Sequence, residues 1–356
     1  MHIAIHLNYN TKYRNFKELF SFSLIFARFS FLKEFCVIAF WSGVCIIGEK
    51  ELILVYQNIE PYLEHVKGQT YCIVTGYSRL PVYKLNDTDV IMIDSGLPRE
   101  WEGIERCLDR ENLNVKAVLT SHYHPDHLGN HLKLRNKFGT ILYLTPFAAA
   151  AKADPMNMLS SMAGILTYRQ AVKYYGTPFA PDRMLDWTAP SVEVEGAVFQ
   201  QLQLPGHCAE QLGFITPDNV CYVADTVLSK PIIEALRSTF TTCVELDLMS
   251  KEKLAELTCD KYIVAHNAVL DSIKELAIQN RDHMLARLEL LESIACDYMD
   301  LDTIVAKFLE VTNNQLNDVR KVTGTRRNVL PLVDYLMDTG RFTARVKDGY
   351  VQYKKA

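Results

Sequence analysis

The sequence predicts a protein of the α+β class, and three stretches of the chain indicate it. Between residues 51 and 93, short runs rich in β-branched and aromatic residues alternate with glycine and Asn-Asp turns, which is typical of antiparallel strands. Residues 101–110 have the period of a helix and lead into an apolar run at 115–119 with the character of a buried strand. After residue 280 the pattern changes to three amphipathic helical segments and a hairpin. We therefore expect mixed sheets with helices packed on them, followed by a small and mainly helical part.

The composition is that of an ordinary globular protein. With 356 residues, 49% hydrophobic and 22% charged, the chain is long enough for two domains with a substantial core. A net charge of -4 argues against a protein that coats nucleic acid, although a local basic patch fits within a balanced total. The nine cysteines are scattered and form no Cys-x-x-Cys pair. This pattern indicates reduced thiols, so we expect a cytoplasmic location.

Residues 1–50 form a hydrophobic extension that has more than one interpretation. A basic lead and a phenylalanine-rich stretch precede an apolar run at 35–48, as in a signal or a membrane anchor. That run is shorter than the roughly 18 to 20 residues that span a bilayer, and it has no obvious small-x-small cleavage site. We interpret the extension either as a non-native start or as an anchor through residues 19–48, with a folded cap as the third alternative.

One short motif, Ser121-His122-Tyr123-His124-Pro125-Asp126-His127-Leu128-Gly129-Asn130, has the strongest chemical signal. It holds three imidazoles and a carboxylate within six consecutive positions, directly after the strand expected at 115–119. Imidazole nitrogens and carboxylate oxygens are donors that suit zinc. His122 and His124 are two apart on an extended segment and face the same side, whereas Asp126 and His127 begin a helix expected to run through 132–138. One stretch of chain can therefore serve two metal ions. A solvated turn is the alternative, which the density of donors disfavours.

Three further donors each follow an apolar strand. His207 comes after a strand expected over 192–204, Asp225 after 220–223 and His266 after 262–265. A single strand-terminal histidine or aspartate is more often structural, but loops from one sheet edge converge, so together with the first motif the three are strong candidates. Asp94 also ends a strand, and we expect it to hydrogen-bond and orient the loop that carries the histidines.

The segment from Pro146 to Tyr174 is expected to be mostly helical. Its alanines, methionines and tyrosines give it an apolar and adaptable character. The sequence leaves two interpretations open. The segment forms either one wall of a substrate pocket or a helical hairpin that covers the core.

The order of these motifs, with Ile-Asp-Ser-Gly upstream, resembles the metallo-β-lactamase fold superfamily over about residues 51–278. The resemblance is greater to the glyoxalase II-like and nuclease-like branches than to lactamases with a cysteine ligand. It implies an αββα four-layer sandwich with the site at the shared edge of two sheets. It further implies a first metal on His122, His124 and His207, a second metal on Asp126, His127 and His266, and a bridging carboxylate from Asp225. Two departures, Gly129-Asn130 and Val264-Ala265, stand where the family often has a glycine pair and Pro-Gly; they alter the backbone but remove no ligand.

The implied cofactor is a pair of zinc ions, with iron or manganese as alternatives. Such a pair would lower the pKa of a shared water and supply a metal-bound hydroxide, which Asp126 would orient as the catalytic residue. The expected substrate is a small ester, thioester or lactone. A metal-dependent ribonuclease or phosphodiesterase is the first alternative. A regulatory protein that keeps the fold without turnover is the second, which the intact ligand set disfavours.

Residues 279–356 are expected to form a separate domain. Helical segments at 281–296, 301–311 and 326–338 precede strands at 341–346 and 350–353, which flank the turn signature Lys347-Asp348-Gly349. Three helices and a hairpin resemble a small winged-helix domain. Basic residues exceed acidic ones between 320 and 355, so contact with nucleic acid through this tail is possible but not favoured. The alternative is a solvated face of a module that packs beside the pocket or mediates a homodimer.

Overall fold

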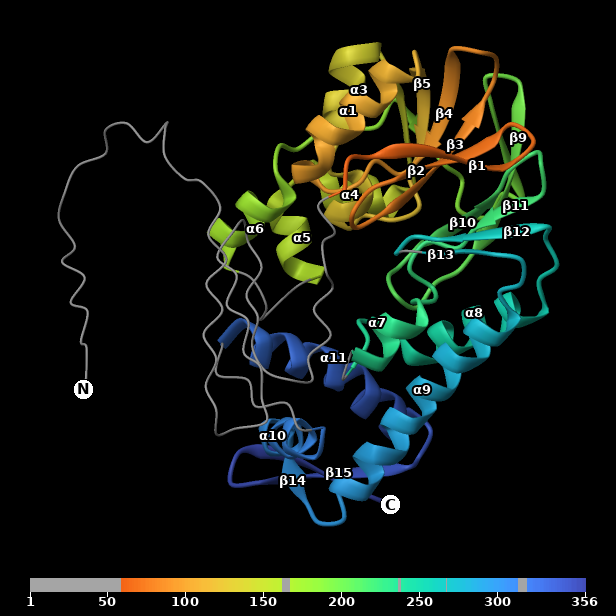
Figure 1. Cartoon of the computed structure of the whole chain (residues 1–356). Coiled ribbons are helices and arrows are strands. Elements are labelled where there is room, and N and C mark those ends of the chain that lie inside the picture. Colours follow the sequence, from red (N-terminus) through yellow and green to blue (C-terminus); the bar gives the residue numbers. More distant parts are fainter. Residues whose placement is uncertain (1–58, 162–166, 236–237, 267, 313–318) are drawn as a thin grey trace, which may run out of the picture. The chain divides into compact units, whose positions relative to one another are not determined.

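The computed structural model describes residues 59–161, 167–235, 238–266, 268–312 and 319–356 (Figure 1). These residues belong to one compact unit. The expected hydrophobic extension, 1–50, and the strand expected at 52–56 lie outside the described residues. Within the described ranges, no helix combines the length and the apolar character that a membrane crossing requires. All seven cysteines in these ranges are free.

The first sheet has seven strands in sequence order. The first four pair antiparallel, as predicted for this part of the chain, and the next three join in parallel. β1 was not predicted from the sequence, because its side chains are half-buried or exposed and charged residues interrupt its apolar pattern. The strands are β1 (Tyr62–Lys67), β2 (Thr70–Val74), β3 (Arg79–Lys84), β4 (Asp89–Ile93), β5 (Asn114–Leu119), β6 (Ile141–Leu144) and β7 (Arg183–Met184).

The second sheet has six strands in the order β13-β12-β11-β10-β9-β8. β11 and β12 are parallel, and the other neighbours are antiparallel. The strand predicted at 192–204 is a hairpin, because Glu195 (φ 50°) and Gly196 (φ 80°) make a turn with two left-handed residues. The strands are β8 (Ser191–Val194), β9 (Ala197–Gln203), β10 (Leu212–Ile215), β11 (Val220–Tyr222), β12 (Lys261–Val264) and β13 (Ala268–Leu270).

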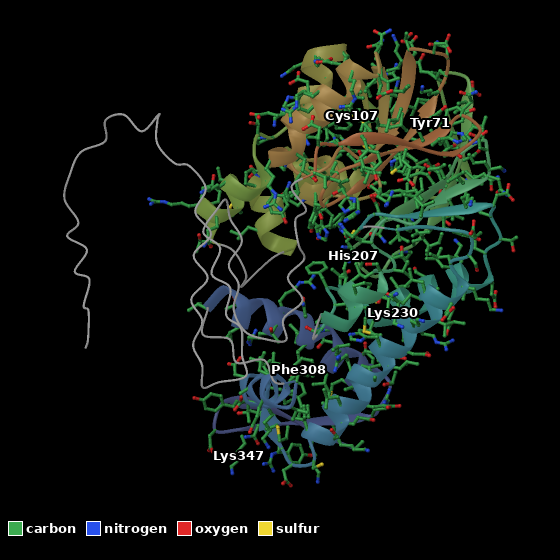
Figure 2. All side chains as sticks on the ribbon, viewed as in Figure 1. Tyr71, Cys107, His207, Lys230, Phe308 and Lys347 are labelled. Carbon is green, nitrogen blue, oxygen red and sulfur yellow. The ribbon has the colours of Figure 1, made fainter. Side chains whose placement is uncertain are left out.

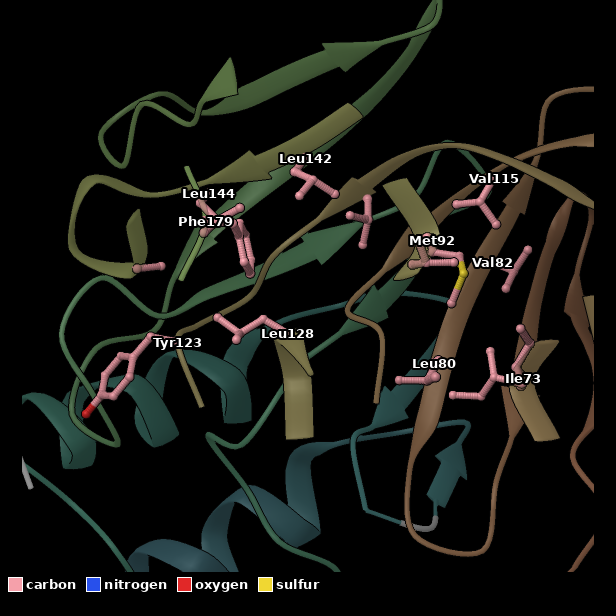
Figure 3. Packing of buried hydrophobic residues seen from close by; sticks show 14 of the residues in the cluster. Ile73, Leu80, Val82, Met92, Val115, Tyr123, Leu128, Leu142, Leu144 and Phe179 are labelled. Atoms are coloured by element: carbon pink, nitrogen blue, oxygen red, sulfur yellow. The ribbon is translucent and has the colours of Figure 1, made fainter. Parts of the chain in front are cut away.

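Alternation along β4 shows how the first sheet is buried on both faces. Ile91 and Ile93 pack with residues of the second sheet, such as Phe214, in the core between the sheets. Val90 and Met92 point the other way, into a core covered by α1 (Trp101–Arg110) and α3 (His131–Phe138) (Figures 1 and 3). This period of two is what a strand between two layers requires.

The outer face of the second sheet is covered by helices as well. Cys221 and Val223 pack there with Leu254 of α8 (Val244–Glu256) and Ala277 of α9 (Lys274–Ile294). The layers are therefore helix, sheet, sheet and helix. This confirms the four-layer sandwich of the predicted α+β class.

The prediction of one continuous helix from Asp126 through Phe138 is wrong, because the helix is interrupted. α2 (Pro125–Leu128) ends at Gly129, and α3 begins after Asn130, whose φ of -114° is not helical. The Asn130 amide donates to the carbonyls of Ser95 (2.7 Å) and Leu97 (2.8 Å). Gly129 lies so close to the Pro125 carbonyl that a Cβ would overlap it. The break ties the histidine loop to the loop after β4.

The helical segment after β6 comprises α4 (Pro146–Ala153), α5 (Pro155–Ser161) and α6 (Tyr168–Tyr175). Ala148, Ala151 and Ala171 are buried in the core outside the first sheet. None of the described residues of these helices lines the cavity at the candidate site. Of the two interpretations left open by the sequence, the covering of the core fits the described residues.

The C-terminal part contains the predicted helices and hairpin, with one additional strand. After α7 (Lys230–Ala235), α8 and α9 come β14 (Met299–Asp300), α10 (Leu301–Val311), α11 (Val319–Asp338), β15 (Phe342–Lys347) and β16 (Tyr350–Lys355). The three strands form a sheet in the order β14-β16-β15. The predicted boundary at 278/279 falls inside α9, which continues from one core into the next. The division into domains and the likeness to a winged helix stay predictions.

Candidate metal centre

All seven predicted metal-ligand residues come together at one edge of the sandwich. The motif after β5 supplies four, and the loops after β9, β11 and β12 each supply one. Figure 2 marks this edge with His207, close to α7. The side chains form two groups that share Asp225.

The first group consists of His122, His124, His207 and Asp225. His122 Nε2 and His207 Nε2 each lie 3.0 Å from His124 Nδ1. Nitrogens that bind one tetrahedral zinc ion at about 2.0–2.1 Å are about 3.3 Å apart, so this spacing suits a single ion. Asp225 Oδ2 lies 3.5 Å from His207 Nε2 and 3.9 Å from His122 Nε2.

The second group consists of Asp126, His127, His266 and the same Asp225. Asp225 Oδ1 lies 3.4 Å from His127 Nε2 and 3.3 Å from His266 Nε2. Asp126 Oδ2 lies 3.8 Å and 3.6 Å from the same two nitrogens. Asp225 therefore turns one oxygen toward each group.

The unsatisfied polar atoms in the two groups test whether they suit a cation. In the described part of the chain, His127 Nε2 and Asp225 Oδ1 are buried without a hydrogen-bond partner. Buried polar atoms are nearly always paired, and an unpaired one is costly. Both atoms point to the centre of the second group, where a divalent cation would satisfy them. The residues present therefore fit the binding of metal ions.

Asp94 has the orienting role that the sequence predicted. It directly follows β4, at a φ of 61°, and accepts hydrogen bonds from Ser121 N (2.8 Å), Ser121 Oγ (2.6 Å) and the Tyr222 hydroxyl (2.8 Å). His127 Nδ1 lies 2.8 Å from the same carboxylate. A carboxylate that holds Nδ1 fixes the ring and directs Nε2 to the centre.

Backbone carbonyls hold two other histidines in the same way. His207 Nδ1 lies 3.2 Å from the Phe240 carbonyl, and His266 Nδ1 lies 3.3 Å from that of Tyr77. Asp225 is held by backbone geometry, since Ala224 before it has a φ of 48°, which is unusual for a residue with a Cβ. Such local strain is commonly found where a side chain must be aimed.

Electrostatics favours the neutral form of the histidines in the first group. Burial lowers the pKa of His124 to about 4 and that of His207 to about 3. Burial also lowers the pKa of His122 well below its usual value. Neutral imidazole is the form that binds a metal, so at neutral pH this group presents three ready nitrogen donors.

In the second group, neighbouring charges outweigh the effect of burial on the pKa values. Burial opposes the charged form of His127, but Asp225 and Asp126 raise its pKa well above the usual value. Burial likewise opposes the ionisation of Asp225, but His127 and His266 hold its pKa well below the usual range. Two carboxylates therefore attract positive charge here, and a divalent cation would take the place of protons on His127 and His266.

A cavity of about 210 Å³ opens on both groups. Its walls include metal-ligand candidates from both groups. The other lining residues were not predicted for the site from the sequence, namely Tyr77, Thr226, Leu228, Ile232, Thr239, Phe240, Asp247, Lys251 and Asn280. Asp247 and Lys251 form a buried ion pair of 2.5 Å between positions i and i+4 of α8. In a sequence, such a pair is typical of an exposed helix face, so no signal marks it.

Family comparison agrees with this fold and site. The model of the metallo-β-lactamase superfamily matches residues 82–266, over half of the chain. The chain belongs to this superfamily, whose members are generally metal-dependent hydrolases.

Two relatives give a more particular likeness. The chain is 24% identical to "Hydroxyacylglutathione hydrolase GloC" of Haemophilus influenzae over 187 residues, which are 51% of this chain and 80% of that protein. It is 23% identical to "Lactamase-like protein aptB" of Emericella nidulans over 232 residues, 63% of this chain and 59% of that protein. The likeness to a glyoxalase II-like protein agrees with the branch that the sequence indicated.

Solved structures share the fold at low sequence identity. A metallo-beta-lactamase family protein from Thermus thermophilus has a TM-score of 0.62 at 18% identity, covering 83% of this chain and 97% of that one. A beta-lactamase domain protein from Burkholderia ambifaria has a TM-score of 0.63 at 20% identity, covering 83% and 93%. At these identities the likeness concerns the fold alone.

Proposed function

We propose that this chain hydrolyses a small ester, thioester or lactone with a pair of divalent metal ions, of which zinc is the first choice. The observation that carries the proposal is the pair of donor groups joined by Asp225, with buried unsatisfied atoms directed at the second centre. The assigned ligands are His122, His124 and His207 for the first ion, Asp126, His127 and His266 for the second, and Asp225 for both. The name of the Haemophilus influenzae relative, a hydroxyacylglutathione hydrolase, supports acyl-group hydrolysis.

When bound, the metal pair supplies an activated water and a Lewis acid for the carbonyl oxygen. Asp126 lines the cavity, and its Oδ2 lies 3.5 Å from the Tyr77 hydroxyl. Asp126 would orient the attacking water there, and the proton that the water loses would pass to the leaving alkoxide or thiolate as its bond to the acyl carbon breaks. Phe240 and Ile232 supply apolar wall that excludes bulk water.

Nucleic-acid cleavage is the less favoured alternative. Several basic side chains of the tail have partners in the described part of the chain. Arg341 makes a bidentate pair with Glu292 (2.8 and 2.9 Å), and Arg326 pairs with Asp302 (2.6 Å). Cations that are already paired have less to offer a phosphate backbone.

Metal analysis together with a substrate screen tests the proposal. We expect about two zinc ions per chain and turnover of a thioester or lactone. His122→Ala should lose the first ion and lower kcat by more than the roughly 100-fold upper range seen for residues that only orient a ligand. His65→Ala is the matched control, since His65 is an exposed histidine away from both donor groups. In the described part of the chain its side chain hydrogen-bonds only the Gly68 carbonyl. A protein without bound metal would contradict the proposal, and cleavage of RNA alone would assign the site to the alternative.

A further inference from the structure

The cavity at the candidate metal centre is small. Its volume of about 210 Å³ lies below the roughly 300–1,000 Å³ of pockets that bury a drug-sized ligand. Four members of the donor groups line one part of it, so the reacting bond of a substrate would lie there, beside Asp126, His207, Asp225 and His266. A space of this size holds the reacting bond and one of the two groups that flank it. The rest of the wall therefore bears on which group that is.

Three side chains supply apolar surface to the rest of the wall. They are Leu228, Ile232 and Phe240. Leu228 lies in the loop after Asp225, Ile232 in α7, and Phe240 between α7 and α8. Figure 2 marks α7 with Lys230, close to His207. The apolar surface and the donor groups thus belong to one cavity.

Three polar side chains of the wall are bonded to the protein itself. Asp247 and Lys251 form the buried ion pair of α8. Asn280 accepts a hydrogen bond from Leu228 N (2.9 Å) and donates to the carbonyls of Leu228 (3.0 Å) and Leu276 (2.8 Å). Both hydrogens of its amide are therefore used. A substrate group that enters this part of the cavity meets apolar carbon and polar groups that already have partners.

The ring of Phe240 is held by neighbours from separate parts of the chain. The guanidinium carbon of Arg327 lies 3.4 Å from the ring centre, and Nη1 of the same arginine donates to the Thr241 carbonyl (2.6 Å). The ring centres of His124 and His207 lie 5.0 Å and 5.1 Å away. The Phe240 carbonyl also lies 3.2 Å from His207 Nδ1. A close-packed ring of this kind resists displacement by a longer substrate group.

Ile232 has a close counterpart on the same helix. Ile232 and its neighbour Ile233 are each 5% exposed, and the backbone N–H of each donates to the Ser229 carbonyl at 3.0 Å. Ile232 lines the cavity, whereas Ile233 is not among its described lining residues. Variants of the two positions therefore separate an effect on the cavity from an effect on α7.

We propose that the cavity binds the acyl part of the substrate and accepts a short, uncharged aliphatic chain, whose length Ile232 and Phe240 limit. The inference rests on the proposed function, which supplies the acyl bond. The leaving alcohol or thiol takes up a proton and departs, so it lies toward the open side. Each methylene beyond the limit would overpack the wall, and a charged chain would be buried without a partner. The preferred substrates are therefore esters or thioesters of short fatty acids.

A series of thioesters of one thiol tests the limit. The substrates are the acetyl, butanoyl, hexanoyl and octanoyl thioesters of N-acetylcysteamine, with the succinyl thioester as the charged counterpart of the butanoyl one. We expect the metal-loaded full chain to prefer the acetyl or butanoyl thioester, with kcat/KM about 10-fold lower or more for each extension beyond the limit. The succinyl thioester should be cleaved more slowly than the butanoyl one. Hydrophobicity alone would favour the longest chain, so a preference for octanoyl or succinyl would overturn the proposal.

Three variants assign the limit to the wall. Ile232→Ala should raise kcat/KM for the hexanoyl thioester, relative to the acetyl one, about 10-fold. Phe240→Leu should shift the preference in the same direction, and Ile233→Ala should leave it as it is. Because the readout is a ratio between two substrates of one preparation, partial unfolding of a variant does not alter it. An equal shift in Ile233→Ala, or no shift in the other two, would refute the role of these side chains.

Calorimetric binding provides a readout that does not depend on turnover. The probes are ketones in which a methylene replaces the thioester sulfur of the acetyl, butanoyl and octanoyl substrates. The two shorter ketones should bind more tightly than the octanoyl analogue, and Ile232→Ala should reduce the difference. This pattern supports the assignment even where no thioester is cleaved and the proposed function itself fails. Thioester cleavage that does not depend on chain length leaves the proposed function intact and refutes the limit.

Discussion

The two donor groups share Asp225 and yet attract a cation in different ways. The first is a cluster of histidines that burial keeps neutral, with three nitrogens drawn together at distances of 3.0 Å around His124 Nδ1. The second gathers two carboxylates with His127 and His266, whose pKa values those carboxylates raise. The first group is thus preorganised by packing, and the second by charge. The difference indicates that either donor group can be damaged without the other.

Removal of the shared carboxylate should have the largest effect. Asp225→Asn keeps the shape of the side chain but removes the charge that both groups use. We expect loss of both ions and a fall in kcat beyond the roughly 100-fold range of orienting residues, measured by elemental analysis and steady-state kinetics. Asp260→Asn, at an exposed carboxylate paired with Lys67, is the control. Retention of one full ion in Asp225→Asn would show that the groups do not depend on a shared ligand.

A backbone change should damage the histidine group by itself. Gly206 precedes His207 at a φ of 126°, and a Cβ there would overlap the backbone of Asp247. We expect Gly206→Ala to lower the free energy of unfolding by about 3 kcal/mol or more and to displace the first ion. Gly139→Ala is the matched control, because Gly139 also has a positive φ (70°) but has open space around it, so it should cost about 1 kcal/mol. Equal losses of stability in chemical denaturation would contradict the close approach.

The smallest effect is expected from the residue that orients His127. Asp94→Asn preserves the shape but weakens the acceptor for His127 Nδ1. Affinity for the second ion should fall by about 10- to 100-fold, as measured by competition with a chelator, with a smaller change for the first ion. Asp89→Asn changes a carboxylate at the other end of β4 and should leave both affinities as they are. A larger loss at the first ion would reverse the assignment of Asp94 to the second group.

The parts of the fold that could be predicted from the sequence are those in which the signal is local. The histidine motif lies within ten consecutive residues, and the later candidates each follow an apolar strand. The strand pattern therefore predicted that these donors lie close together, and the structure has all seven at one edge. Asp94 was predicted by the same rule. Its contacts with Ser121 and His127 confirm the orienting role.

The features that the sequence did not reveal depend on contacts between distant segments. The break at Gly129 and Asn130 comes from the loop after β4, which no helical periodicity reports. Phe240 lies at the cavity, where both its backbone carbonyl and its ring contact His207. The residues around Phe240 in the sequence do not indicate these contacts. Arg327 lies far along the chain from Phe240, and yet its guanidinium carbon lies 3.4 Å from the centre of the Phe240 ring. A sequence pattern indicates which face of a helix or strand is apolar, but not which distant segment of the chain packs against that face.

Helix α9 contributes side chains to two hydrophobic cores. Ala277 packs under the second sheet, Asn280 lines the cavity, and Met284 and Leu288 enter the C-terminal core, at the spacing of one helical face. Neither core can come apart along this face without disturbing a rigid helix of 21 residues that the other core also holds. We therefore expect the two cores to unfold together, so that the edge that carries the metal-ligand candidates is lost or kept together with the C-terminal part.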